Sequence, residues 1–243
     1  MKRLLAALLI LFAAPLAAQD LSPEEKAAIN AQIRAYILEN PEIIVEAMQV
    51  LEQREQNAQA DADRRLVSSL REPLENDGFS HIGGNLEGDV TVIEFVDYRC
   101  PYCKRAHDSV KALMASDPNV RLIIKEFPIL GPESTFASRA AMAVLNQGGD
   151  LYETFNDAMM RHQGDLSQQM VMQLAESVGA DMPRLAQDVQ DPEIAANIRE
   201  TYALARRLDI SGTPAFIIGD QIIRGFVPYD TLRELVEDAR EAG

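Results

Sequence analysis

The feature that most constrains this chain is a pair of cysteines, Cys100 and Cys103, which are the only two among 243 residues. A disulfide between residues three apart closes a very small loop, so it restricts the unfolded chain little. A structural zinc site normally needs four ligands, and the three histidines are scattered along the sequence. A redox-active dithiol is the interpretation that fits the pair best, because such a small ring forms and breaks easily.

The residues around the pair predict a strand followed by a helix. The apolar, β-branched run 90–96 (VTVIEFV) is typical of a buried strand. Pro101 suits the first turn of a helix, and apolar residues recur at helical spacing from 103 to 115. We therefore expect Cys100 at a helix N-terminus, where free backbone N–H groups and the helix dipole stabilise a thiolate. Cys100 would be the exposed nucleophile and Cys103 the buried resolving thiol. Because Pro101 and Tyr102 include no ionisable histidine, the stabilisation should be weaker than in a CPHC motif.

One acidic residue, Glu94, lies inside the apolar strand, six positions before Cys100. A buried charge is costly unless it has a partner or a role. We interpret Glu94 as an acid that relays a proton to Cys103 during exchange. A carboxylate paired at a strand end is the alternative, and Lys125 in the next predicted strand is a candidate partner.

A second motif lies far downstream, where the run 211–219 (SGTPAFIIG) enters an apolar strand through Thr213 and Pro214. Proline is unusual there because it lacks the N–H that a ladder uses. CPYC, Glu94 and Thr213-Pro214 together resemble the thioredoxin superfamily, in which this proline is cis and faces the CxxC. The rest of the chain follows the same pattern: a Gly-Asp turn, a strand at 221–224 and a last helix at 228–242.

The interval from 127 to 210 is much longer than in thioredoxin and is mostly helical in pattern. Apolar spacing, N-cap residues and glycine stops predict five helices, at 134–146, 151–161, 167–178, 182–189 and 191–208. A helical insert of this size, about 130–208, resembles the DsbA-like thiol-disulfide oxidoreductases. Four methionines in the insert are interpreted as core residues, with a copper-binding thioether surface as the alternative.

An N-terminal extension precedes this domain. A capping box with proline at the first helical position starts one helix at residues 22–25, and Asn40-Pro41 separates it from a second. Each carries a short apolar stripe, but residues 52–65 stay helical in composition without one. Two such stripes are too small for a core of their own, so they must dock elsewhere. Self-association is favoured, and folding back on the same chain is the alternative.

The extension, with the phrases NPEIIVEAM and GGNLEGDVTVIEFVDYRCPYC, resembles the ScsC family (suppressor of copper sensitivity protein C) and its Com1-like relatives. The resemblance implies a periplasmic DsbA-like protein that trimerises through its N-terminal helices and acts as a disulfide isomerase. It also implies that Cys100 attacks, that Cys103 resolves, and that Thr213-Pro214 contacts the client. The reduced CxxC of such proteins can take Cu(I), so Cys100 and Cys103 are candidate copper ligands.

The N-terminus has the layout of a secretory signal: Lys2 and Arg3, an apolar run at 4–14, and small residues up to Ala18. The run is shorter than the roughly 20 apolar residues of a membrane-spanning helix. We expect cleavage after Ala18 and export to the oxidising periplasm. The net charge of −15 argues against nucleic acid as a partner, because phosphates attract basic surfaces.

The sequence thus predicts an α/β thioredoxin fold with a DsbA-type helical insert. The expected parts are a signal peptide (1–18), a helical oligomerisation region and linker (19–77) and a catalytic domain (78–243). Three functions stay open: an oligomeric disulfide isomerase, a monomeric DsbA-like dithiol oxidase, and a copper(I)-binding protein of copper tolerance that uses the same cysteines. The expected partners are misoxidised or reduced client proteins and a membrane redox protein that sets the resting state. No cofactor is required.

Overall fold

The computed structural model describes residues 21–242, so the signal peptide predicted at 1–18 lies outside the described residues. The chain divides into two compact units, residues 1–56 and 57–243. Within the described range, no helix combines the length and apolar character that crossing a bilayer requires.

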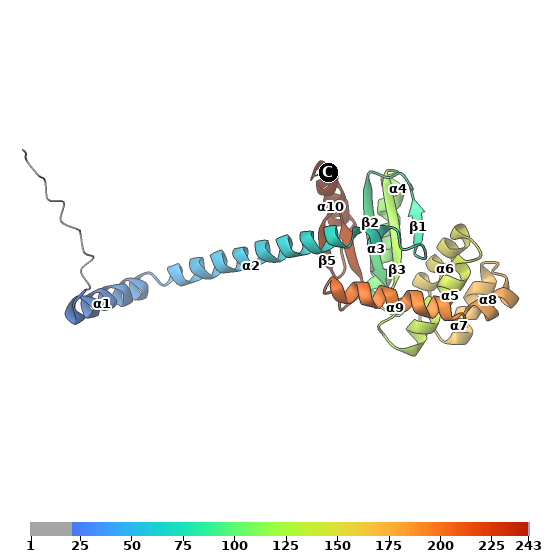
Figure 1. The fold of residues 1–243 in the computed structure, drawn as a ribbon, viewed down its shortest axis with the longest axis horizontal. Coiled ribbons are helices and arrows are strands. Elements are labelled where there is room, and N and C mark those ends of the chain that lie inside the picture. Colours follow the sequence, from blue (N-terminus) through green and yellow to red (C-terminus); the bar gives the residue numbers. More distant parts are fainter. Residues whose placement is uncertain (1–20, 243) are drawn as a thin grey trace, which may run out of the picture. The chain divides into compact units, whose positions relative to one another are not determined.

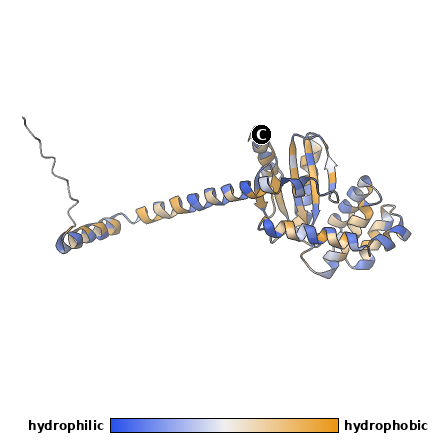
Figure 2. Ribbon diagram, viewed as in Figure 1, coloured by the Kyte–Doolittle hydropathy of each residue, from blue (hydrophilic) through white to orange (hydrophobic). Residues whose placement is uncertain are grey.

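The first unit contains α1 (Pro23–Glu39) and the beginning of α2 (Glu42–Ser69). The predicted capping box is present: Ser22 Oγ accepts from the backbone N–H of Glu25, whose carboxylate accepts from the N–H of Ser22. No residue of α1 is buried. Figure 2 shows hydrophobic residues along α1 and the first turns of α2. Nine of them are 41–68% exposed: Ile29, Ile33, Tyr36, Leu38, Ile44, Val45, Met48, Val50 and Leu51.

The second unit is built on a five-stranded sheet of order β1-β3-β2-β4-β5 (Figure 1). Its strands are β1 (His81–Gly84), β2 (Val90–Val96), β3 (Val120–Glu126), β4 (Ala215–Ile218) and β5 (Gln221–Arg224). The central strands β2 and β3 are parallel and are joined through α4 (Pro101–Ser116), while the other neighbours pair antiparallel. This is the thioredoxin fold that the sequence predicts. Strand β1 was not predicted, because a four-residue segment with two glycines carries little strand pattern.

Both faces of the sheet are buried, and successive residues of each strand point to opposite faces. On one face, Val92, Leu122 and Phe216 belong to a core that includes residues of α4, of the helical insert and of α10 (Tyr229–Ala242). On the other, Ile93, Ile123 and Ile217 pack with residues of α2, α3 (Arg71–Glu75) and α9 (Pro192–Arg207).

The predicted helical insert is confirmed. It consists of α5 (Pro132–Leu145), α6 (Gly149–Arg161), α7 (Gln168–Ser177), α8 (Met182–Asp188) and α9, and Figure 1 shows α5 to α8 gathered together. Met159 and Met160 are at most 3% exposed within it, and Met170 and Met172 are partly buried against the same core. These four methionines therefore serve packing rather than a surface.

The unit that holds the cysteine pair begins at Asn57, well before the boundary expected at 78. Leu70 and Leu74 are each 1% exposed and belong to the core under the sheet. Arg224 of β5 forms a two-pronged ion pair with Asp63 of α2, with nitrogen–oxygen distances of 2.8 and 3.3 Å. The part 63–77 of the expected linker therefore carries side chains that pack on the sheet, and a truncated catalytic unit has to keep them.

Candidate active site

The cysteine pair lies where β2 ends and α4 begins. Cys100 is the N-cap residue of α4, with φ −75° and ψ 118°, and Pro101 occupies the first turn. Cys103 faces the core from the first turn of the helix and is fully buried. Cys100 is only 5% exposed, so the expectation of an exposed nucleophile is wrong.

The loop before β4 lies against Cys100, within hydrogen-bond distance. The Thr213–Pro214 peptide bond is cis, and the Cys100 thiol in its protonated form donates a hydrogen bond to the carbonyl oxygen of Thr213 at 3.2 Å. The Pro214 carbonyl accepts from the N–H of Gly225, which attaches the loop to the end of β5. The structure thus brings together two motifs that are 113 residues apart in the sequence.

The two thiols have opposite acidities. A hydrogen bond from Cys103 lowers the pKa of Cys100 to about 5, and contacts with Thr213 and the backbone N–H groups of Cys103 and Tyr102 act in the same direction, against the effect of burial. Burial raises the pKa of Cys103 far above its usual range, helped by the hydrogen bond to Cys100 and by the negative charge that Glu94 carries once it ionises. Cys100 is therefore a thiolate at neutral pH while Cys103 keeps its proton. The value for Cys100 lies above the ~3.5 of DsbA.

Asp97 fixes the turn that carries Cys100, and sequence reasoning missed it. Its carboxylate is completely buried and accepts three hydrogen bonds of 2.8–2.9 Å, from the N–H groups of Arg99 and Leu130 and the hydroxyl of Ser134. Its backbone carbonyl accepts from the N–H of Cys100. One side chain therefore joins the end of β2, the active-site turn and the start of α5. An acidic residue directly after a buried strand is the signal that could have found it.

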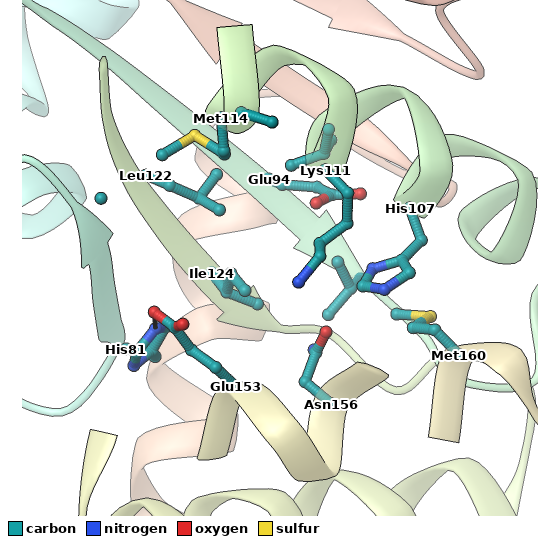
Figure 3. Close-up of a pocket in the computed structure, with 14 residues that line it drawn as sticks. His81, Glu94, His107, Lys111, Met114, Leu122, Ile124, Glu153, Asn156 and Met160 are labelled. Carbon is teal, nitrogen blue, oxygen red and sulfur yellow. Dashed lines mark hydrogen bonds and ion pairs between the residues drawn. The ribbon is translucent and has the colours of Figure 1, made fainter. Parts of the chain in front are cut away.

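Glu94 is 4% exposed, and burial raises its pKa to about 8, so it is protonated at neutral pH. It lines a pocket of about 310 Å³ between α4, α6 and the strands β1 to β3. Figure 3 shows the side chains of Glu94, His107 and Lys111 directed into this pocket. The pocket gives the buried carboxyl a path to solvent, on the face of the sheet that also carries Cys103.

Lys125 is not the partner of Glu94, so that prediction is wrong. In the β2–β3 register Glu94 lies opposite Ile124, and Lys125 lies opposite Phe95, on the other face. Lys125 instead pairs with Asp77 at 2.6 Å and donates to the Pro73 carbonyl at 3.2 Å. Successive residues of one strand point to opposite faces, so the register decides which residue of the next strand shares a face with Glu94, and the sequence alone does not reveal the register.

A second buried carboxyl, Glu126, also lies near the site and was not predicted. Its Oε1 accepts hydrogen bonds from the hydroxyls of Tyr98 and Tyr152 at 2.7 and 2.8 Å, and Tyr98 accepts from the Asn156 amide. Burial raises the pKa of Glu126 to about 7. This cluster connects the end of β3 and the active-site turn to α6 of the insert.

Of the remaining predicted residues, Pro101 starts α4 and Tyr102 projects outward, with 56% of its side chain exposed. Within residues 21–242, no group of three or more His, Cys, Asp or Glu side chains has the geometry of a metal site. A metal bound at the cysteines would have to accept two sulfur ligands.

Comparison with known proteins agrees with this geometry. Residues 91–237 match the DSBA-like thioredoxin domain, and residues 25–58 match the copper resistance protein ScsC N-terminal domain. A thioredoxin-like oxidoreductase from Silicibacter pomeroyi is 44% identical, with a TM-score of 0.68 over 71% of this chain and 99% of that one. Proteus mirabilis ScsC in a transitional conformation is 27% identical, with a TM-score of 0.68 over 92% of this chain and 100% of that one.

Among curated proteins, disulfide bond formation protein D of Bacillus subtilis is 26% identical and aligns with 63% of this chain and 74% of its own length. The chain also matches Na⁺/H⁺ antiporters NhaA, such as NhaA 1 of Salinispora arenicola at 29% identity over 71% of this chain, but it spans only 26% of that protein's length. Because the family match covers more than half of the sequence and the site has the geometry described above, the chain belongs to the DSBA-like thioredoxin domain family, with an ScsC-type N-terminal region.

Proposed function

We propose that this protein is a thiol-disulfide oxidoreductase that acts on disulfides of client proteins through Cys100 and Cys103. The observation that carries the proposal is the Cys100 sulfur, which lies at the N-terminus of α4 and beside the cis Thr213–Pro214 bond with a pKa near 5. A thiolate at neutral pH is both the attacking species and a good leaving group in disulfide exchange.

The chemistry follows from the unequal thiols. The reduced Cys100 thiolate attacks a client disulfide, forms a mixed disulfide and releases one client thiolate. If that client thiolate attacks another disulfide of the client, it releases a new client thiolate. When a client thiolate then attacks the mixed disulfide, Cys100 leaves as a thiolate and the client is isomerised. If Cys103 loses its proton and attacks Cys100, the enzyme disulfide forms and the client leaves reduced. The oxidised enzyme runs the second route backwards and oxidises a client dithiol.

Glu94 supports the step that involves Cys103. When Cys103 leaves as a buried thiolate, it needs a proton. The protonated Glu94 carboxyl is neutral, so it can stay buried without a charge penalty until it donates that proton. The pocket beneath α4 then lets Glu94 exchange its proton with solvent. We assign Glu94 the role of proton relay for Cys103.

The N-terminal region supports an oligomeric isomerase over a monomeric oxidase. In the first unit ten large apolar residues are 41–68% exposed, and no residue of α1 is buried. Exposed apolar surface of this density marks an association site. The ScsC-type match at 25–58 falls on the same residues. We propose that these helices form a homotrimer that holds several active sites around one client, in the periplasm, with a membrane redox partner that sets the resting redox state of Cys100 and Cys103.

A second candidate function is copper(I) binding at the same cysteines. Two free, adjacent thiols, one of them acidic, suit a soft ion that accepts two sulfur ligands. Cys100 and Cys103 would hold the ion, which would block exchange while bound.

The first prediction concerns the Cys100 thiolate. Alkylation by iodoacetamide should modify one thiol of the reduced protein, with a rate that rises as the pH passes about 5 and levels off above it. In Cys100→Ser, Cys103 should stay unreactive through pH 9. A midpoint near 8.5, the value of a free thiol, would contradict the assigned roles.

The second prediction concerns Glu94. Glu94→Gln should slow reduction of the enzyme disulfide by roughly tenfold, below the ~100-fold of full acid–base catalysis because water in the pocket can replace the relay.

Glu94 should also make the free energy of unfolding depend on pH. In the wild type the folded state keeps a proton that the unfolded state has released, so stability falls as the pH rises from about 4.5 through 8, and this fall should be smaller in the variant.

The matched control is Glu153→Gln, which changes a carboxyl of the same pocket whose side chain is 53% exposed. Stopped-flow reduction by dithiothreitol and urea unfolding at pH 5 and 8 measure both effects. Equal rates in Glu94→Gln and Glu153→Gln would remove Glu94 from the mechanism.

The third prediction separates isomerase from oxidase. The chain from Gln19 should sediment as a trimer and reactivate scrambled ribonuclease. A chain starting at Asn57, which keeps Leu70 and Leu74 in the core, should be monomeric, oxidise reduced ribonuclease and fail to unscramble it. The double variant Ile33→Glu/Ile44→Glu keeps the N-terminal helices but should also be monomeric and behave like the short chain. It shows whether the activity depends on trimer formation or on the N-terminal residues themselves. A monomeric full-length chain would favour the oxidase.

The fourth prediction concerns copper. Titration of the reduced protein with Cu(I) against a chromophoric competitor should show one ion per chain, and Cys100→Ser should lose it. Undiminished affinity in Cys100→Ser would rule out the cysteine pair as the copper site.

A further inference from the structure

Large apolar side chains are buried through most of the second unit, but some are exposed near the active-site turn. Among its described residues, three large apolar side chains are exposed: Leu86, Tyr102 and Leu130, by 65, 56 and 42%. Tyr102 stands between the two cysteines, and the backbone of Leu130 is hydrogen-bonded to Asp97 in the active-site turn. Two of the three therefore lie at the active-site turn or at the start of α4.

One cation in this area is held in an unusual way. The guanidinium carbon of Arg105 lies 4.4 Å from the ring centre of Phe226 and 5.9 Å from that of Tyr102. Both distances fall in the range of cation–π attraction. Arg105 is exposed, and it forms no ion pair with a carboxylate within residues 21–242.

The other two cations beside the cysteine pair are already engaged. Arg99 donates to the Leu130 carbonyl at 2.9 Å and pairs with Glu133 at 3.1 Å. Lys104 donates to the His162 carbonyl at 2.6 Å. Of these three cations, Arg105 is the one that forms no hydrogen bond or ion pair with a residue in the range 21–242, so its N–H donors are left for a ligand.

The ring that supports Arg105 is attached to the loop that faces Cys100. Phe226 follows Gly225, whose N–H donates to the Pro214 carbonyl at 2.9 Å. Arg105 lies five positions after Cys100, which is about 7.5 Å of helix rise along α4. An extended chain covers that distance in two to three residues, at ~3.3 Å each.

We propose that Arg105, seated on Phe226, binds a carboxylate side chain of the client, so that client segments with Asp or Glu two or three residues from the reacting cysteine are preferred. A planar guanidinium offers paired N–H donors that match a carboxylate, and ring stacking holds it in place before binding. The net charge of −15 does not cancel this, because exposed charges beyond ~8 Å are screened at physiological salt. The inference rests on the proposed exchange function and specifies its substrates.

The test uses the oxidised full-length chain and two peptides, each with one cysteine, that differ only in Asp or Asn two residues from it. The peptide thiolate attacks Sγ of Cys100, the Cys100–Cys103 bond breaks, and Cys103 leaves as the thiolate and takes up a proton. Stopped-flow kinetics give the second-order rate constant for each peptide. The Asp/Asn ratio is compared between the wild type, Arg105→Ala, Arg105→Lys and Arg199→Ala. The last removes the same charge from an exposed position on α9.

We expect Arg105→Ala to lower the Asp/Asn ratio by about two- to fivefold, the range of an exposed ion pair, while the Asn peptide reacts at an unchanged rate. Arg105→Lys should keep part of the preference, Arg199→Ala all of it, and 1 M salt should abolish it. Comparing the Asp/Asn rate ratio of each variant with that of the wild type cancels the effect of Asp on the reactivity of the peptide's own thiol, which is the same for every variant.

An unchanged ratio in Arg105→Ala, or an equal loss in Arg199→Ala, would overturn the proposal. Thermal unfolding of each variant shows whether a rate change comes from misfolding. If instead the wild type reacts with neither peptide, the exchange function itself fails, and this outcome is distinct from a lost preference.

Discussion

The active site depends on the antiparallel pairing of β2 with β4. In that register Phe95 lies opposite Ala215, so the residues that follow β2 and those that precede β4 emerge at the same edge of the sheet. This places the N-terminus of α4 and the cis Thr213–Pro214 loop against each other. A shift by one residue would exchange the two faces of the strand, turn Glu94 away from Cys103 and bring Phe95 into its place.

Burial is used in opposite ways at the two sulfurs. Cys103 lies in the apolar core, where a thiolate is disfavoured, while Cys100 lies at the helix cap among hydrogen-bond donors. The same contrast holds for the carboxyls: Asp97 has three donors and keeps the turn in place, whereas Glu94, which has burial alone, holds its proton. Position relative to donors, more than residue type, assigns each group its role.

Much of this architecture could be predicted from the sequence, because its signals are local. A cysteine pair followed by proline, the β-branched run before it and the Thr-Pro entry to a strand each reflect rules that operate over a few residues. The five helices of the insert follow from caps and apolar spacing in the same way. The prediction that Lys125 pairs with Glu94 was wrong, because pairing across strands depends on the register. The domain boundary expected at 78 lies earlier in the structure, because Leu70 and Leu74 follow a polar helical stretch and are buried only against the folded sheet.

The order of residues defines which chemistry is available: two cysteines at CxxC spacing, an acid six residues earlier, a distant Thr-Pro and two helices with short apolar stripes. How these groups act depends on the folded structure. It covered Cys100 with the Thr213 loop, gave Asp97 its three donors, paired Lys125 with Asp77 and seated Arg105 on Phe226. The reason is physical. Residue identity sets which bonds are available, but acidity and specificity depend on burial and on donors within about 3–4 Å, which long-range strand pairing brings into place.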